Sequence, residues 1–237
     1  MQTMRETMTT SRTEGQRSGE FFKKLSPAAL RDLESMEFPT LYQPGVQLFS
    51  EKSSVTGVFI VISGEVKLSI NSSEGKRLIL SIAKAGEILG LSSVLSGLPS
   101  EMTAEIQFPA RIAVIERSQF IAFMGRHPEV YQVVTQELSL QYKVACEQLR
   151  TVALSGSAPE KLARLLLEWS ENSGQKTEAG TRFRFSLTHE EIGEFIGASR
   201  ETVTRTLSTF KSRRLVAFHG SILEIPSRVA LQNLAGV

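Results

Sequence analysis

The sequence has few of the residues that build metal and redox centres. It contains one cysteine, Cys146, and three histidines among 237 residues. A single cysteine excludes an intramolecular disulfide framework and any multi-cysteine zinc or iron–sulfur site within one chain. The composition therefore predicts a reduced, cytoplasmic setting with no cofactor and no bound metal.

Long apolar runs are also missing. Runs such as residues 58–62 stop far short of the roughly 20 residues needed to span a bilayer. Residues 1–20 have no apolar core of the kind that marks a secretory signal. We therefore expect no membrane partner. The net charge of +2 is too balanced to indicate a nucleic-acid partner by itself.

Signatures of catalysis are absent as well. No histidine occurs between Leu41 and Glu116, which removes the ligands that a metal-dependent barrel enzyme would need. There is no P-loop, no nucleophile elbow and no CxxC motif. The sequence predicts that the protein is not an enzyme.

Between Leu41 and Glu116 the sequence predicts an antiparallel sandwich or barrel. Short stretches rich in Val, Ile and Phe are separated by turn residues such as Ser63-Gly64 and Pro109. The expected strands are 46–49, 58–62, 66–70, 78–82, 103–106 and 112–115. Residues 86–97 instead predict a strand end followed by one or two helical turns that Gly97 closes. The amides at the start of that helix are a candidate anion cradle.

Two helices flank this region. The first is expected to begin at Pro27 with Ser26 as its N-cap. The second covers 128–154 and has no internal Gly or Pro. Its apolar residues recur every three or four positions, as in a coiled-coil seam: Val130, Val134, Leu138, Tyr142, Ala145, Leu149 and Val152. This pattern indicates a homodimer, and packing of one amphipathic helix against its own barrel is the alternative.

Residues 188–214 predict two helices joined by a tight turn. Thr188 and Glu191 form a capping box, and Gly193 leaves room for a second helix to cross closely. Gly197 is free to adopt a positive φ, and Ser199 can cap the helix that follows.

The second helix has two different faces. At about 100° per residue, Val203, Leu207 and Phe210 form one narrow apolar stripe, and Glu201 and Arg205 lie close to the opposite side. Arg can donate two hydrogen bonds to guanine, and Glu can accept one from cytosine. Five basic residues and one acidic residue give +4 within this segment: Arg200, Glu201, Arg205, Lys211, Arg213 and Arg214. DNA reading is the preferred interpretation, and a solvated face on a helical hairpin is the alternative. Residues 215–225 predict a small β-hairpin beside the reader.

The motif Gly-Ala-Ser-Arg-Glu-Thr-Val-x-Arg at 197–205, with Ile-Gly at 192–193, closely resembles the winged helix-turn-helix of the CRP/FNR family of bacterial transcription regulators. The glycine pattern of the barrel resembles the cyclic-nucleotide-binding fold of that family. The resemblance implies an α+β protein with a jelly-roll effector domain, a long dimerisation helix and a winged helix-turn-helix. The implied boundaries are a flexible tail over 1–20, the jelly roll over 21–127, the helix over 128–154, a hinge over 155–159 and the DNA-binding domain over 160–237.

The resemblance also implies roles for individual residues. It implies that Arg200, Glu201 and Arg205 contact base edges and that the DNA site is a palindrome with TGTGA-like half-sites. Phosphate contacts fall to Thr188, His189, Ser199, Thr202 and Lys211. At position 189 an Arg is common in the family. Double-stranded DNA and a second copy of the chain are the expected partners, and RNA polymerase is a further candidate.

The effector is not identified by the resemblance. In the cyclic-AMP-binding members the short barrel helix carries a Glu for the ribose, and a following Arg-Ser pair holds the phosphate. Here Leu91 and Met102 stand at the Glu and Arg positions, so the pocket would lack its charge-assisted contact to the phosphate. Tight cyclic-AMP binding is therefore not expected. The corresponding pocket residues are Gly90, Leu91, Ser92, Ser93, Met102, Thr103, Ala145 and Cys146.

Three alternatives to control by an unknown small effector remain. Haem ligation through His127 and oxidant sensing by Cys146 are less favoured than helix-start and packing roles. An architectural DNA binder with a ligandless barrel is the third alternative. Trp169 is expected to serve packing only.

Overall fold

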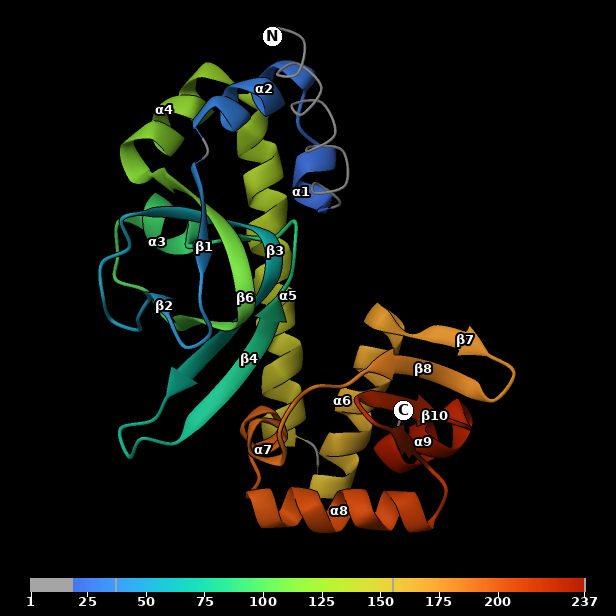
Figure 1. Ribbon diagram of the computed structural model, residues 1–237. Helices are drawn as coiled ribbons and strands as arrows, with labels where there is room; N and C mark the ends of the chain where they lie inside the picture. Colours follow the sequence, from blue (N-terminus) through green and yellow to red (C-terminus); the bar gives the residue numbers. More distant parts are fainter. Residues whose placement is uncertain (1–18, 37, 155, 237) are drawn as a thin grey trace, which may run out of the picture. The chain divides into compact units, whose positions relative to one another are not determined.

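The computed structural model describes residues 19–36, 38–154 and 156–236, and its chain divides into two compact units (Figure 1). The first unit runs to Gly75 and resumes at Leu80–Val144, and the second comprises Lys76–Ile79 and Ala145–Val237. The division falls inside the long helix and inside the strand Arg77–Ala83, which is described below with the first unit. Most of the predicted tail, residues 1–18, lies outside the described residues, as does Ser155 in the predicted hinge.

The first unit is built on an antiparallel sheet. Its helices and strands are α1 (Glu20–Lys23), α2 (Pro27–Met36), β1 (Phe38–Tyr42), β2 (Gln47–Phe49), β3 (Gly57–Asn71), β4 (Arg77–Ala83), β5 (Ile88–Leu89), α3 (Leu91–Ser96), β6 (Thr103–Glu116) and α4 (Arg117–Arg126). The strand order is β1-β6-β3-β4, with β2 paired to β6 and β5 paired to β3. The predicted antiparallel fold is confirmed.

Two strands, β3 and β6, are longer than predicted, because each joins two of the stretches that were expected to be separate strands. Ser63-Gly64 and Pro109, which were expected to be turns, lie inside β3 and β6. The register between these strands shifts beside Ser63 and Glu65, which is the signature of β-bulges. Gly64 takes φ +89°, and a Cβ there would lie 2.6 Å from Ala110. These residues therefore bend a continuous strand pair and do not end it. Strand β1 was not predicted.

Several local predictions for this unit are confirmed. Helix α2 begins at Pro27, and Ser26 Oγ accepts a hydrogen bond from the Ala29 amide at 3.2 Å. Helix α3 follows β5 and ends at Gly97, which takes φ +74°. None of the helices in the described part of the chain is long and apolar enough to cross a membrane.

Helix α5 (Glu129–Leu154) is the longest helix, close to the predicted 128–154. The first part of its apolar stripe belongs to the barrel core, where Val130 and Val134 are 0% and 2% exposed. Leu138 packs against the same core. The alternative interpretation, packing on the barrel, is therefore correct for this part of the helix.

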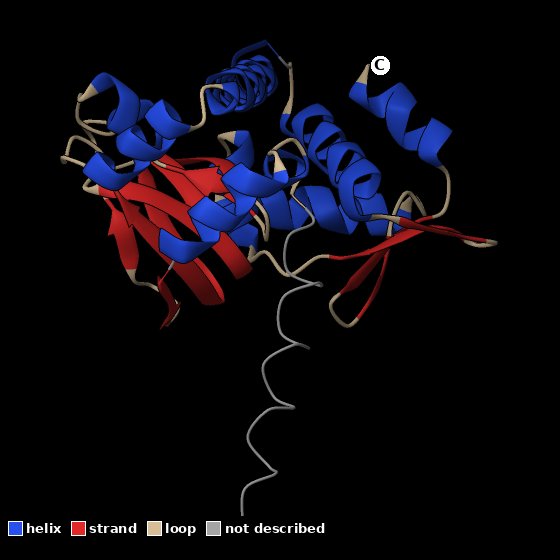
Figure 2. Ribbon diagram, turned by 90° about the horizontal axis from the view of Figure 1, so that it is seen from above, coloured by secondary structure: helices blue, strands red, loops and turns tan. Residues whose placement is uncertain are grey.

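The second unit combines helices with a four-stranded antiparallel sheet, whose strand order is β7-β8-β10-β9. Its further elements are α6 (Ala158–Ser173), β7 (Gln175–Thr177), β8 (Gly180–Arg184), α7 (His189–Ile196), α8 (Arg200–Ser212), β9 (Ala217–His219), β10 (Ile222–Ile225) and α9 (Arg228–Ala235). The sheet lies along one side of the unit's helices (Figure 2). The hairpin predicted over 215–225 is confirmed as β9 and β10, and β7 and β8 were not predicted.

Candidate nucleic-acid interface

The start of α7 is fixed by the predicted capping box. Thr188 Oγ1 accepts a hydrogen bond from the Glu191 amide at 3.1 Å, and the Thr188 amide donates to Glu191 Oε2 at 3.0 Å. The helix buries Ile192, Phe195 and Ile196, the three apolar residues that the sequence predicted. Both ends of the capping interaction are satisfied, so the first turn of α7 is rigidly placed.

The turn between α7 and α8 depends on two glycines and a serine. Gly197 takes φ +65°, which costs glycine little. Gly193 leaves room for the turn, because a Cβ at this position would lie 2.4 Å from the Ala198 carbonyl oxygen. The Ala198 amide donates to the Gly193 carbonyl oxygen at 2.9 Å. Ser199 Oγ accepts from the Thr202 amide at 3.2 Å and caps α8 as predicted. Together these contacts set how α8 leaves α7.

Helix α8 has the two faces that the sequence predicted. Val203, Leu207 and Phe210 are buried, and Arg200, Glu201 and Arg205 are exposed. Thr206 is also buried, at 5%, which was not predicted. Its hydroxyl donates to the Thr202 carbonyl oxygen at 2.7 Å, so a polar residue is accommodated on the buried face without an unsatisfied donor.

Glu201 is held in its charged form. A hydrogen bond from its own backbone amide and a second one from Ser199 lower the pKa of the Glu201 carboxyl, with a further contribution from Arg200. An ionised carboxylate can only accept hydrogen bonds. The exposed face of α8 therefore carries two guanidinium donors, on Arg200 and Arg205, and one carboxylate acceptor.

The proposed phosphate contacts lie at three places around this face. Ser199 and Thr202 lie at the start of α8, where their hydroxyl oxygens are 3.2 Å apart. Thr188 and His189 lie at the start of α7. Lys211 lies near the end of α8, and its Nζ is 4.5 Å from the centre of the Phe218 ring on β9, a cation–π contact. Thr188 and His189 thus lie at the start of α7, whereas Ser199 and Thr202 lie at the start of α8, after the turn at Gly197.

One contact across the two helices was not predicted. His189 Nδ1 lies 2.8 Å from Thr204 Oγ1, and Thr204 Oγ1 donates to the Arg200 carbonyl oxygen at 2.9 Å. The sequence signal for it is weak, because the two residues are fifteen positions apart and only the fold of the turn brings them together.

The predicted effector segment lies against the barrel core. Leu91 is fully buried in the core, and Met102 packs partly against it. Thr103 Oγ1 accepts from the Glu51 amide at 3.0 Å, and Ser92 Oγ donates to Glu101 at 2.7 Å. Gly90 takes φ +80° at the start of α3, and Ser93 is buried. The apolar side chains at 91 and 102 thus serve packing.

The remaining predicted residues lie on α5. Ala145 and Cys146 are exposed and partly exposed, respectively. Tyr142 and Leu149 are strongly exposed at 74% and 66%, and Val152 is half-buried. Of the seven residues predicted at the dimer interface, Val130 and Val134 have almost no surface left for a partner. Val130 and Val134 therefore serve the core of their own chain, and a dimer interface over the other five residues stays a prediction.

Other polar and aromatic residues have structural partners. His127 Nε2 lies 2.9 Å from Asp32 Oδ2 on α2. This contact agrees with the structural role at a helix start that was predicted for His127. Trp169 makes edge-on contacts with Phe185 and Phe195, in keeping with a packing role. Gln148 was not predicted, and its Nε2 donates to the Phe195 carbonyl oxygen at 2.7 Å.

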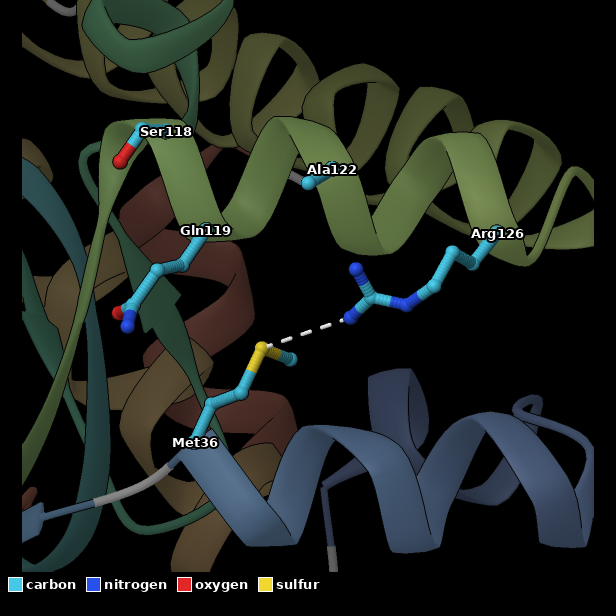
Figure 3. Close-up of a pocket in the computed structure, with 5 residues that line it drawn as sticks. All are labelled: Met36, Ser118, Gln119, Ala122 and Arg126. Carbon is cyan, nitrogen blue, oxygen red and sulfur yellow. Dashed lines mark hydrogen bonds between the residues drawn. The ribbon is translucent and has the colours of Figure 1, made fainter.

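A pocket in the first unit lies away from the predicted effector residues. It is lined by residues of α2 and α4, as Figure 3 shows: Met36, Ser118, Gln119, Ala122 and Arg126. Arg126 Nη2 lies 3.9 Å from Met36 Sδ and also donates to Asp32 at 2.9 Å. None of the residues predicted to hold an effector lines this pocket.

Helices α7 and α8 are joined by a short turn and followed by a β-hairpin, which is the arrangement of a winged helix-turn-helix. Together with the antiparallel barrel of the first unit, it is typical of a helix-turn-helix transcription regulator. Residues 39–150 match the family model described as the cyclic nucleotide-binding domain, and residues 160–234 match the Crp-like helix-turn-helix domain. The chain belongs to the CRP/FNR family of transcription regulators.

Relatives cover most of the chain. The chain is 25% identical over 214 residues to the CRP-like cAMP-activated global transcriptional regulator of Mycobacterium tuberculosis, covering 90% of this chain and 95% of that protein. It is 24% identical over 195 residues to the fumarate and nitrate reduction regulatory protein of Vibrio cholerae, covering 82% and 77%.

Solved structures share the fold. FixK2 from Bradyrhizobium japonicum matches with a TM-score of 0.73 at 23% identity, covering 84% of this chain and 96% of that one. CooA from Carboxydothermus hydrogenoformans matches with a TM-score of 0.74 at 20% identity, covering 86% and 89%. The α+β fold class predicted from the sequence is confirmed.

Proposed function

We propose that the protein is a homodimeric regulator that recognises a palindromic, TGTGA-like DNA site through the exposed face of α8. Arg200 and Arg205 would donate to guanine edges and Glu201 would accept from cytosine. The observation that carries this proposal is the division of α8 into a buried face and a face with two exposed guanidinium groups and an ionised carboxylate.

Phosphate contacts would fix the register of α8 on the duplex. Ser199 and Thr202 offer hydroxyls at the start of α8, and Thr188 and His189 offer polar groups at the start of α7. Lys211 would contribute from the far end of α8. These residues form no continuous sequence motif, because they lie at the start of α7 and at both ends of α8.

A second copy of the chain would pack on the exposed side of α5. At about 100° per residue, Tyr131, Tyr142 and Leu149 lie within roughly 20° of one another on the helix surface. All three are more than half exposed, at 51%, 74% and 66%, and Ala145 extends the same stripe. Large apolar side chains exposed in one line are typical of a coiled-coil seam.

The effector, if the protein has one, would differ from cyclic AMP. The M. tuberculosis relative is described as cAMP-activated, but in this chain Leu91 is a core residue and Met102 carries no charge. A cyclic phosphate in that segment would find no guanidinium partner. A different small ligand would have Ser92, Ser93 and Thr103 as its polar contacts in this segment. The buried Leu91 favours the second candidate, a regulator or architectural DNA binder that works without any ligand.

Selection of bound duplexes from a random oligonucleotide pool tests the proposal. We expect a palindrome with half-sites one helical turn apart, because a dimer presents two copies of α8. Adding a cell metabolite extract to a parallel selection separates an effector-controlled regulator from a ligand-independent one. Recovery of random sequence, or of a single half-site only, would count against dimeric base reading. A cytoplasmic location and a contact with RNA polymerase stay predictions.

A further inference from the structure

The hydroxyl of Thr204 contacts both the backbone of its own helix and the ring of His189 on α7. Thr204 Oγ1 lies 2.9 Å from the Arg200 carbonyl oxygen and 2.8 Å from His189 Nδ1. A hydroxyl has one proton to donate. Two oxygens at this separation repel unless a proton lies between them, so the hydroxyl proton is directed to Arg200. Thr204 is then the acceptor toward His189, and Nδ1 must carry a proton.

This assignment has a consequence for the other ring nitrogen. A neutral imidazole carries one N–H, and here that N–H is at Nδ1. Nε2 of neutral His189 is therefore a bare acceptor. DNA phosphate oxygens are acceptors as well, so the neutral ring has no hydrogen bond to offer them. Only the imidazolium form, with a second proton at Nε2, can donate to a phosphate.

The position of His189 suits such a contact. It is the exposed first residue of α7, and Thr204 fastens it to the helix that carries Arg200 and Arg205. The charged residues that follow it in sequence are Glu190 and Glu191 on α7, and those beside Thr204 on α8 are Arg200, one turn earlier, and Arg205. The Glu191 carboxylate is held by the capping box with Thr188, so it is already occupied within α7.

We propose that His189 is a proton-dependent phosphate contact and that Thr204 is its positioning residue. DNA binding would take up one proton at Nε2 in each protomer, because the phosphate favours the charged form. The bound state then holds more protons than the free state, so affinity rises as the pH falls through the range in which histidines titrate. This inference rests on the proposed function.

The test measures binding of the full-length protein to a labelled duplex with two TGTGA half-sites, and to a scrambled duplex, from pH 6 to pH 8. For both duplexes we expect affinity at pH 8 to be about tenfold lower than at pH 6, since one charge-assisted contact is lost. The slope of log affinity against log salt should be steeper at pH 6 by about 1 per contact. Both duplexes should respond, because phosphate contacts carry no sequence information.

Matched variants assign the effect to His189. His189→Arg keeps a permanent charge and should bind tightly at every pH, and His189→Gln should bind weakly at every pH. His219→Gln removes a histidine from the same unit and should keep the pH dependence of the natural protein. A pH slope that survives in both His189 variants would overturn the proposal.

Thr204→Val tests whether the Thr204 hydroxyl determines which nitrogen of neutral His189 carries the proton. Without the hydroxyl, neutral His189 is free to carry its proton on Nε2 and to donate to a phosphate, so the pH dependence should become shallower. Nitrogen-detected NMR of the free protein should find the proton of neutral His189 on Nδ1. A proton on Nε2 would overturn the inference. Binding without any pH slope would overturn this inference alone, and no binding at any pH would overturn the proposed function with it.

Discussion

The carbonyl oxygen of Ala198 lies 2.4 Å from the point at which Gly193 would carry a Cβ atom. The neighbour is backbone and cannot rotate away, so any side chain at 193 forces the turn between α7 and α8 to move. The orientation of the reading helix thus depends on the absence of one methyl group.

Gly193→Ala should destabilise the second unit. Overpacking a tight site costs about 1–3 kcal/mol, and the free energy of unfolding from denaturant titration should fall by that amount. Gly125→Ala is the control, because a Cβ at Gly125 meets nothing within 4 Å. In helix α4 that change should be neutral or slightly stabilising. Equal effects of the two substitutions would show that the close approach at Gly193 is not limiting.

Arg200→Ala and Arg205→Ala should each weaken binding to the selected duplex by about 1–3 kcal/mol and relax the preference at one base position. The physical reason is the loss of a bidentate donor to a guanine edge. Equilibrium titrations against the selected site and its single-base variants measure both effects. Equal losses on selected and random DNA would mean that these arginines contact phosphates.

Affinity for the selected duplex should fall steeply with added salt. Each phosphate neutralised by a basic side chain contributes about −0.9 to the slope of log affinity against log salt. The exposed basic residues of one α8 segment include Arg200, Arg205 and Lys211, and a dimer doubles them. Between 50 and 200 mM salt, several phosphate contacts should lower the affinity by about 10³-fold. A nearly flat response over this range would be incompatible with the proposed interface.

The helix-turn-helix formed by α7 and α8 could be predicted from the sequence in detail because its contacts are local. The capping box at Thr188, the turn at Gly197 and the cap at Ser199 each involve residues within three or four positions of one another. Such patterns are visible as spacing. The contact of His189 with Thr204 depends on how two helices cross, which spacing does not reveal.

The barrel was predicted less accurately because its strands are shaped by partners distant in sequence. Ser63-Gly64 has the composition of a turn, yet pairing with β6 keeps β3 continuous through a bulge. Likewise, an apolar stripe every three or four residues does not distinguish a core from a dimer seam. Val130 and Val134 proved to be core residues, and Tyr142 and Leu149 remained exposed.

Calorimetry should detect no micromolar binding of cyclic AMP. Leu91 is a fully buried core residue, and Met102 cannot form the paired hydrogen bonds that a guanidinium offers to a phosphate. The measurement uses the full-length protein at concentrations where a micromolar Kd gives clear heats. A saturable isotherm would mean that the phosphate is held by groups other than those at positions 91 and 102.

Leu149→Glu should convert the proposed dimer into a monomer, since Leu149 is 66% exposed and its replacement puts like charges opposite each other across a two-fold seam. Sedimentation velocity should find a dimer for the natural protein and a monomer for the variant, without a change in the unfolding of the barrel. Val134→Ala is the matched control on the same helix. It should leave the dimer intact but lower the free energy of unfolding by about 1–3 kcal/mol, because Val134 is buried in the barrel core. If Leu149→Glu stays dimeric while Val134→Ala dissociates, the two parts of the α5 stripe have been assigned the wrong way round.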